Sequence, residues 1–76
     1  MAQLNATLHQ PVLHLRIAGH STELPLAALR LDAASPDARI KQAVAAHLEL
    51  PLATLDDYVI VRHAHAIVVR PEAVYG

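Results

Sequence analysis

The chain of 76 residues has no cysteine, no phenylalanine and no tryptophan, and it has only two tyrosines. Without cysteine it can form no disulfide, no thiolate nucleophile and no zinc–thiolate site, which fits a cytosolic protein. Without large aromatic side chains, a core must be built from alanine, leucine and valine. A chain of this length is expected to form one small domain.

The sequence also lacks a strong charge of either sign and any long apolar run. Six basic residues face seven acidic ones, so the formal net charge is −1. This balance excludes the basic footprint of proteins that bind nucleic acid or anionic membranes. No stretch approaches the roughly 18 apolar residues of a membrane span, and no basic segment leads into an apolar run near Met1. We therefore expect a soluble, cytoplasmic protein with no nucleic-acid or membrane partner.

The first half of the chain is typical of a β-hairpin. Apolar and polar residues alternate from 12 to 18, which predicts a half-buried strand. Residues 19–21 are expected to form a turn, and residues 22–26 a second strand. Pro25 cannot donate a ladder hydrogen bond, so this strand should lie at a sheet edge. Residues 27–34 fit either an extended continuation or a helical turn.

A helix and two further strands are expected in the second half. Ser35, Pro36 and Asp37 are typical of a helix start, with the serine hydroxyl as the capping acceptor. Apolar residues then follow helical spacing, and Pro51 should end the helix near residue 50. Residues 58–62 and 66–70 are dense in β-forming residues. The apolar run 67–69 predicts that the last strand is an inner one.

Histidines and paired acids are the remaining candidates for chemistry within the body of the chain. His63 and His65 would share one face of an extended segment and suit a metal ion, but the sequence fixes no third ligand, so no metal site is expected. His47 is expected on the inner face of the helix, partly buried and hydrogen-bonded. Asp56 and Asp57 are better explained by turn formation before residue 58 than by acid–base catalysis.

Glycine is scarce, and its placement is informative. One of the two glycines is Gly19, so there is no glycine-rich phosphate loop. The other, Gly76, is the last residue of the sequence and follows the short segment 71–75. A glycine at a chain end makes no turn, but its carboxylate has no side chain beside it and can enter a narrow site in a partner enzyme.

The order strand, strand, helix, strand, strand describes an α+β domain whose helix packs on one face of a mixed four-stranded sheet. This ββαββ order over residues 12–76, together with the terminal glycine, resembles the β-grasp fold of ubiquitin-like proteins. It implies a β-grasp domain at 12–70 and a C-terminal tail at 71–76. Residues 1–11, where Leu4, Ala6 and Leu8 alternate with polar neighbours before Pro11, are expected to form an N-terminal arm or an extra strand. Ubiquitin and sulfur carriers typically end in two glycines. This chain, with Tyr75 before Gly76, is more similar to bacterial modifiers that end in a single glycine.

The resemblance implies that the protein is a substrate of other enzymes and not itself an enzyme. Gly76 would be activated by an ATP-using, E1-type enzyme, passed to an E2-like enzyme, joined to an amine of a target protein and released by a metallopeptidase-type deconjugase. The chain itself would need no cofactor. Recognition of the tail would fall to four residues: Glu72, Ala73, Val74 and Tyr75. Lys41 is the only lysine, so chain linkage would use Lys41 or the amino group of Met1.

Two other functions stay open from the sequence. A β-grasp adaptor, or a homo-oligomer, would use an edge strand or the N-terminal segment and would not need Gly76. A sulfur carrier would bear a thiocarboxylate on Gly76.

Overall fold

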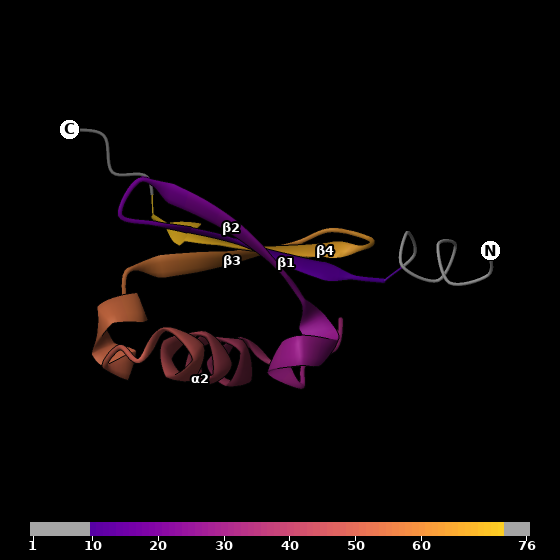
Figure 1. Cartoon of the computed structure of the whole chain (residues 1–76), viewed down its shortest axis with the longest axis horizontal. Coiled ribbons are helices and arrows are strands. Elements are labelled where there is room, and N and C mark those ends of the chain that lie inside the picture. The colour runs from indigo at the N-terminus through magenta and orange to yellow at the C-terminus, as the bar shows by residue number, and fades with distance from the viewer. Residues whose placement is uncertain (1–9, 73–76) are drawn as a thin grey trace.

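Four strands form one mixed sheet in the order β2-β1-β4-β3, and one α-helix lies across it (Figure 1). The structure, a computed structural model, describes residues 10–72. Most of the expected arm 1–11 and most of the expected tail 71–76 lie outside these residues. The elements are β1 (Val12–Ile17), β2 (His20–Pro25), the 3₁₀ helix η1 (Leu26–Leu29), α2 (Asp37–Leu48), the 3₁₀ helix η2 (Leu52–Leu55), β3 (Tyr58–Arg62) and β4 (Ala66–Pro71). The predicted α+β class with a four-stranded mixed sheet is confirmed.

The β1–β2 hairpin turns at Ala18 and Gly19, earlier than the predicted turn at 19–21. Both residues have positive φ, at 52° and 79°. Two-residue hairpin turns of the primed type require this conformation at both central positions, because their twist matches that of the strands. Gly19 adopts it without steric cost. His20 and Ser21 are therefore free to pair in β2, opposite Ile17 and Arg16.

The first and last strands lie side by side at the centre of the sheet. β1 pairs with β4 in parallel, with Leu13 opposite Ile67 and Leu15 opposite Val69. β2 and β3 then form the two edges. The prediction that β4 is an inner strand is confirmed, as is the edge position of β2 that Pro25 required.

Strand alternation sends one set of apolar side chains toward α2. Leu15 on β1 and Val69 on β4 are almost fully buried, at 1% and 0% exposure, against Ile40 and Val44 of the helix, each at 0%. Leu26 and Leu55 of the two 3₁₀ helices close the ends of this layer. Among residues 10–72 the buried residues are Leu13, Leu15, Leu26, Leu29, Leu31, Ile40, Ala43, Val44, Ala45, Leu55, Ile67 and Val69. The core is therefore wholly aliphatic, as the composition required.

Helix α2 differs from its prediction at both ends. No side chain caps its N-terminus, and Pro36 occupies the N-cap position. The Ser35 hydroxyl instead accepts from the Asp32 amide at 2.9 Å, within the preceding turn. At the other end Glu49 is left-handed with φ 56°, and the Leu50 amide donates to the Ala45 carbonyl at 2.9 Å. This closing pattern ends the helix at residue 48, before the proline acts.

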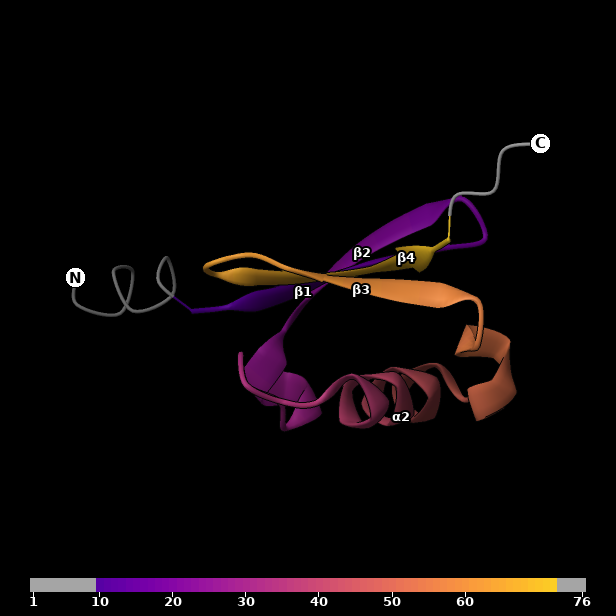
Figure 2. The ribbon, with the colours of Figure 1, turned by 180° about the vertical axis from the view of Figure 1, so that it is seen from behind.

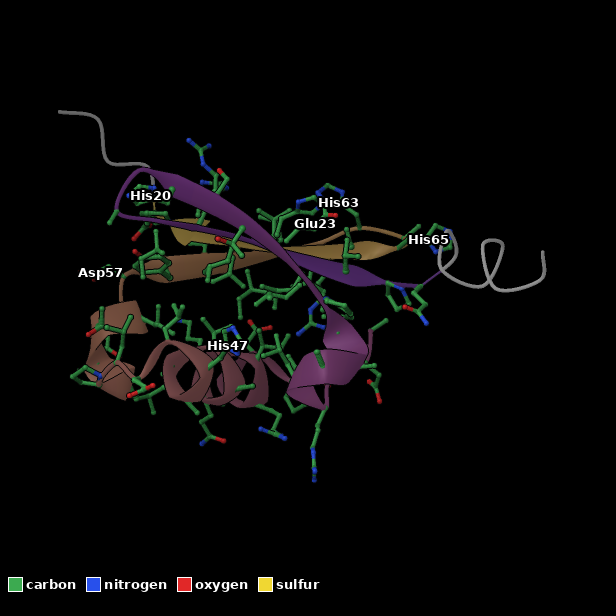
Figure 3. All side chains as sticks on the ribbon, viewed as in Figure 1. His20, Glu23, His47, Asp57, His63 and His65 are labelled. Atoms are coloured by element: carbon green, nitrogen blue, oxygen red, sulfur yellow. The ribbon has the colours of Figure 1, made fainter. Side chains whose placement is uncertain are left out.

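His47 is exposed, contrary to the prediction that it faces the core. The helix turns Ala43, Val44 and Ala45 inward and leaves Leu48 partly buried, so His47 falls on the solvent side. Figure 3 shows its place on α2. The error arose because an i+7 spacing from Ile40 was treated as part of the apolar face.

Arg62, at the end of edge strand β3, connects the loop before α2 to the sheet through hydrogen bonds and an ion pair. Its guanidinium donates to the Ala33 carbonyl at 3.0 Å and the Ser35 carbonyl at 2.7 Å. It also pairs with the Asp37 carboxylate at 2.6 Å. Carbonyls that have no other partner in the loop are thereby satisfied, and the start of α2 is fixed relative to the sheet.

Replacing Arg62 with alanine should lower the free energy of unfolding by about 1–2 kcal/mol, because three charge-assisted contacts are lost from a partly exposed site. Urea unfolding followed by circular dichroism measures this. Arg62→Lys should recover less than half of the loss, since an ammonium cannot hold this forked geometry. Arg39→Ala on the exposed side of α2 is the control. Equal effects of Arg62→Ala and Arg39→Ala would contradict the role assigned to Arg62.

Candidate functional site: the end of β4 and the open sheet face

Of the predicted tail residues, Glu72 alone lies within the described part of the chain. It follows the last residue of β4, Pro71, and both are exposed. The Glu72 amide donates to the Asp57 carbonyl at 2.9 Å, so the backbone at residue 72 still lies beside the start of β3. Ala73, Val74, Tyr75 and Gly76 lie outside the described residues. Glu72, the last described residue, therefore lies between the end of central strand β4 and the start of β3.

Lys41, the predicted linkage residue, lies on α2 and is half-buried. The helix packs along one face of the sheet, whereas Glu72 follows the end of β4 (Figure 2). These two predicted site residues therefore belong to different parts of the fold, and no hydrogen bond or ion pair joins them among the described residues. Within residues 10–72 the Lys41 side chain forms no hydrogen bond or ion pair, so the structure gives it no role beyond that of a helix side chain.

The histidines and paired acids are surface residues. His63 and His65 occupy the loop between β3 and β4, where Figure 3 labels them, and both are exposed. Within residues 10–72 no group of three histidine or acidic side chains is placed to hold a metal ion. Asp56 and Asp57 form the turn that leads into β3, as predicted. They offer turn geometry and no enclosed site.

A cleft of about 390 Å³ lies where β1 turns into β2 and β4 ends. Its lining is Arg16, Ile17, Ala18, Gly19, Arg70, Pro71 and Glu72. Two of the residues in this lining, Arg16 and Arg70, are basic, and one, Glu72, is acidic. Neither arginine forms an ion pair with any residue from 10 to 72. Arg70 makes one long contact, from its guanidinium to the Pro71 carbonyl at 3.4 Å.

Two residues of the cleft, Arg16 and Arg70, belong to the sheet face that α2 does not cover, because they alternate with the buried Leu15 and Val69. Alternation along the strands places Arg16 and Ser21 opposite each other on this face, and Arg70 opposite Val59. The next row holds the ion pair between the His14 imidazole and the Glu23 carboxylate, at 3.2 Å, beside Val68 and Val61. We call the side chains of Arg16, Arg70, Val59, Val61 and Val68 the open-face patch.

The open-face patch is apolar toward β3 and basic at the cleft. Its three valines are half-buried, although no element among the described residues packs over them. Val68 lies between Val61 on β3 and His14 on β1, so the apolar part is continuous across two strands. Such a surface combines dispersion contacts with two charged donors, and it can bind a ligand that carries both an aliphatic group and an anion.

No protein-family model, curated protein or solved structure matches this chain. In the part of the chain that the structure describes, none of the helices combines the length and apolar character that crossing a membrane would need. Function is therefore inferred from the residues and their arrangement.

The sequence did not indicate the open-face patch. Arg16 and Arg70 are far apart in the chain, and they meet only because β1 and β4 pair in parallel with Leu15 opposite Val69. The one available signal was their common position, since each directly follows a buried strand residue. This common position predicts that the two arginines lie on neighbouring strands only when the register between β1 and β4 is known.

Proposed function

We propose that this chain is a ubiquitin-like protein modifier with a β-grasp fold. In this proposal Gly76 is the residue through which it is attached to target proteins. The modifier is a substrate of an E1-type adenylating enzyme and an E2-like conjugating enzyme, and it is removed by a metallopeptidase-type deconjugase.

The sheet order is the observation that carries the proposal. Two hairpins, β1–β2 and β3–β4, flank a central parallel pair, and α2 makes the crossover between them on one face. This is the arrangement that the β-grasp resemblance implied from element order alone. Glu72, the last described residue, follows the end of this central pair and lines the cleft together with Arg16 and Arg70.

The chemistry would reside in the partner enzymes. The carboxylate of Gly76 attacks the α-phosphorus of ATP and releases pyrophosphate. A cysteine thiolate of the E1 displaces AMP to form a thioester, which is exchanged onto an E2 cysteine. A target amine then displaces that thiolate and forms an amide. Because glycine has no side chain, its carbonyl is unhindered at each of these steps, and Glu72 to Tyr75 supply the contacts that guide it.

A second candidate function rests on the free edge of β2. His20 to Glu23 are all exposed, and β2 has a hydrogen-bonding neighbour on one side only among the described strands. Such an edge can pair with a strand of another protein or of a second copy. A non-conjugated adaptor or homo-oligomer of this kind would function equally well without Gly76.

Capture from cells of the native source tests the proposal. A chain with an affinity tag at its N-terminus is purified under denaturing conditions and digested with a protease that cleaves after glutamate. A conjugate leaves the remnant Ala73–Gly76 on a target lysine, because cleavage occurs after Glu72. We expect target peptides that carry this remnant by mass spectrometry.

The outcomes separate the candidate functions. Linked peptides support the modifier. A mass gain of one sulfur in place of oxygen at Gly76 would identify a sulfur carrier. Complexes that dissociate fully on denaturation, with no linked peptide, would contradict conjugation and leave the adaptor.

A further inference from the structure

We propose that the cleft between the β1–β2 turn and the end of β4 binds a small molecule that carries a phosphate monoester. In this proposal Arg16 and Arg70 hold the phosphate dianion, and the organic group of the molecule lies in the rest of the cleft. The contact is non-covalent, and it is independent of Gly76 and of the proposed modifier function.

The first argument is the placement of two like charges on neighbouring strands. Arg16 and Arg70 lie one residue beyond the opposed pair Leu15 and Val69, so the parallel register sets them next to each other. Like charges that face each other across strands lower the stability of a sheet. Within residues 10–72 neither arginine forms an ion pair. A dianion bound between them would remove the repulsion, and its two negative charges match the two guanidiniums.

The second argument is the set of hydrogen-bond donors around this position. The partner of Arg16 in β2 is Ser21, so a hydroxyl extends the row that the two arginines form across the sheet. A phosphate monoester presents three acceptor oxygens, and guanidinium groups bind such oxygens through two parallel hydrogen bonds. A carboxylate presents only two oxygens and a single charge. The donor set therefore favours phosphate over carboxylate.

The third argument is the size and lining of the cleft. Its volume is about 390 Å³, which falls within the range of about 300–1,000 Å³ that is typical of pockets for small organic molecules. Beyond the arginines, the lining continues with Ile17, Ala18, Gly19 and Pro71. Gly19 has nothing within 4 Å of the point where a side chain would begin. Inorganic phosphate alone would leave this apolar part unfilled, so we infer an ester with a small organic group.

Two contacts of the cleft determine how binding should respond to substitution. Glu72 belongs to the lining, and its negative charge opposes an incoming anion. The Arg70 guanidinium donates to the Pro71 carbonyl at 3.4 Å. That distance is long for a hydrogen bond, so a phosphate oxygen can readily replace the carbonyl. Removing the charge of Glu72 should strengthen binding, whereas removing the charge of either arginine should weaken it.

Titration of the ¹⁵N-labelled full chain with phenyl phosphate, at physiological ionic strength to screen non-specific attraction, tests the site. We expect a dissociation constant below about 1 mM. Chemical shift changes should centre on the backbone amides of residues 16–19, 70 and 72 and on the Nε–H groups of the two arginines. Inorganic phosphate should bind at the same residues but more weakly. Acetate should cause no comparable changes.

Four variants test the assignment. Arg16→Gln and Arg70→Gln should each weaken phenyl phosphate binding roughly tenfold or more, as expected for a lost charge-assisted hydrogen bond. Glu72→Gln should strengthen it about two- to fivefold, the effect of removing one exposed like charge. Arg39→Gln on the exposed side of α2 changes the net charge equally and should leave binding unchanged.

The thermal midpoint separates binding from a structural role of the arginines. Phenyl phosphate at saturation should raise the midpoint of the unmodified chain, because a ligand that binds the folded state stabilises it. A chain with both Arg16→Gln and Arg70→Gln should show no such rise. Without ligand its midpoint should be no lower than that of the unmodified chain, since the repulsion is gone. A lower midpoint would overturn the argument from like charges.

The binding proposal fails if phenyl phosphate causes no shift changes, or if the changes follow α2 or β3 instead of the cleft. It also fails if acetate or inorganic phosphate binds as tightly as phenyl phosphate. Equal weakening by Arg39→Gln and by the two cleft variants would show attraction to net charge and would contradict a defined site.

Discussion

A chain made to end at Tyr75 is expected to form no adducts with target proteins, whereas a chain made to end at Gly76 forms them. Loss of Gly76 moves the reactive carboxylate back by one residue and places the bulky Tyr75 side chain next to it. An adenylating site built for an unhindered glycine would then be blocked, because small displacements of reacting atoms reduce rates severely. Adducts are measured by immunoblot of the tagged chain after expression in the native cells.

Two controls make this result specific. A chain with one alanine added after Gly76 should also fail, because its reactive end is displaced in the opposite sense. Lys41→Arg should retain adducts on other proteins and lose only those linked through its own lysine. The shortened chain keeps the hydrogen bond from the Glu72 amide to Asp57, so its unfolding midpoint should not change. Adducts of equal yield from the chain ending at Tyr75 would exclude Gly76 as the attachment point.

Replacing Leu15 with alanine is expected to leave much of the protein unfolded at 25 °C. Leu15 is 1% exposed at the centre of β1, between strands on both sides and beneath α2. Removing a buried leucine side chain costs about 2–5 kcal/mol, because transfer energy is lost and a cavity remains. A domain of this size has about 3–5 kcal/mol of stability in total. Far-UV circular dichroism with urea titration measures the loss.

Leu52→Ala is the matched control for this substitution. Leu52 lies on η2 and is 47% exposed, so the same chemical change should cost well under 1 kcal/mol. A Leu15→Ala protein as stable as Leu52→Ala would show that the central strand does not pack as the structure describes.

The strands could be predicted from local pattern because each signal acts within its own segment. Alternation of leucine with His14 and Arg16 requires a strand with one buried face, and the missing amide of Pro25 requires an edge. Strand β3 was predicted with its observed bounds, 58–62, because valine, isoleucine and tyrosine are concentrated there. These features depend little on the rest of the molecule.

The connections could not be predicted in the same way. Residues 26–29 form η1 because Leu26 and Leu29 reach the core from a tight turn, a choice made by tertiary packing. Ser35 suits a helix cap, yet its hydroxyl bonds to Asp32 while Arg62 holds the Ser35 carbonyl. Arg62 is 27 residues away along the chain. Local preference was overridden by a contact that only the folded sheet provides.

The two parts of the candidate site, the C-terminal residues and the open-face patch, differ in the same respect. Gly76 and its neighbours could be proposed from the sequence, because that hypothesis rests on residues adjacent in the chain and on no contact in space. The open-face patch combines residues from β1, β3 and β4, and it exists only when those strands are in register. The residue pattern of a single segment therefore cannot predict the patch.

The central pairing of β1 with β4 has a consequence for biosynthesis. β4 joins both halves of the sheet and is the last of its four described strands to be synthesised, so a nascent chain that has released β1, β2 and α2 still lacks the middle of its sheet. Until Ala66–Pro71 emerges, the apolar faces of β1 and α2 have no lasting partner. The sheet therefore cannot be completed until β4 has been released, and until then the incomplete chain is exposed to proteases and chaperones.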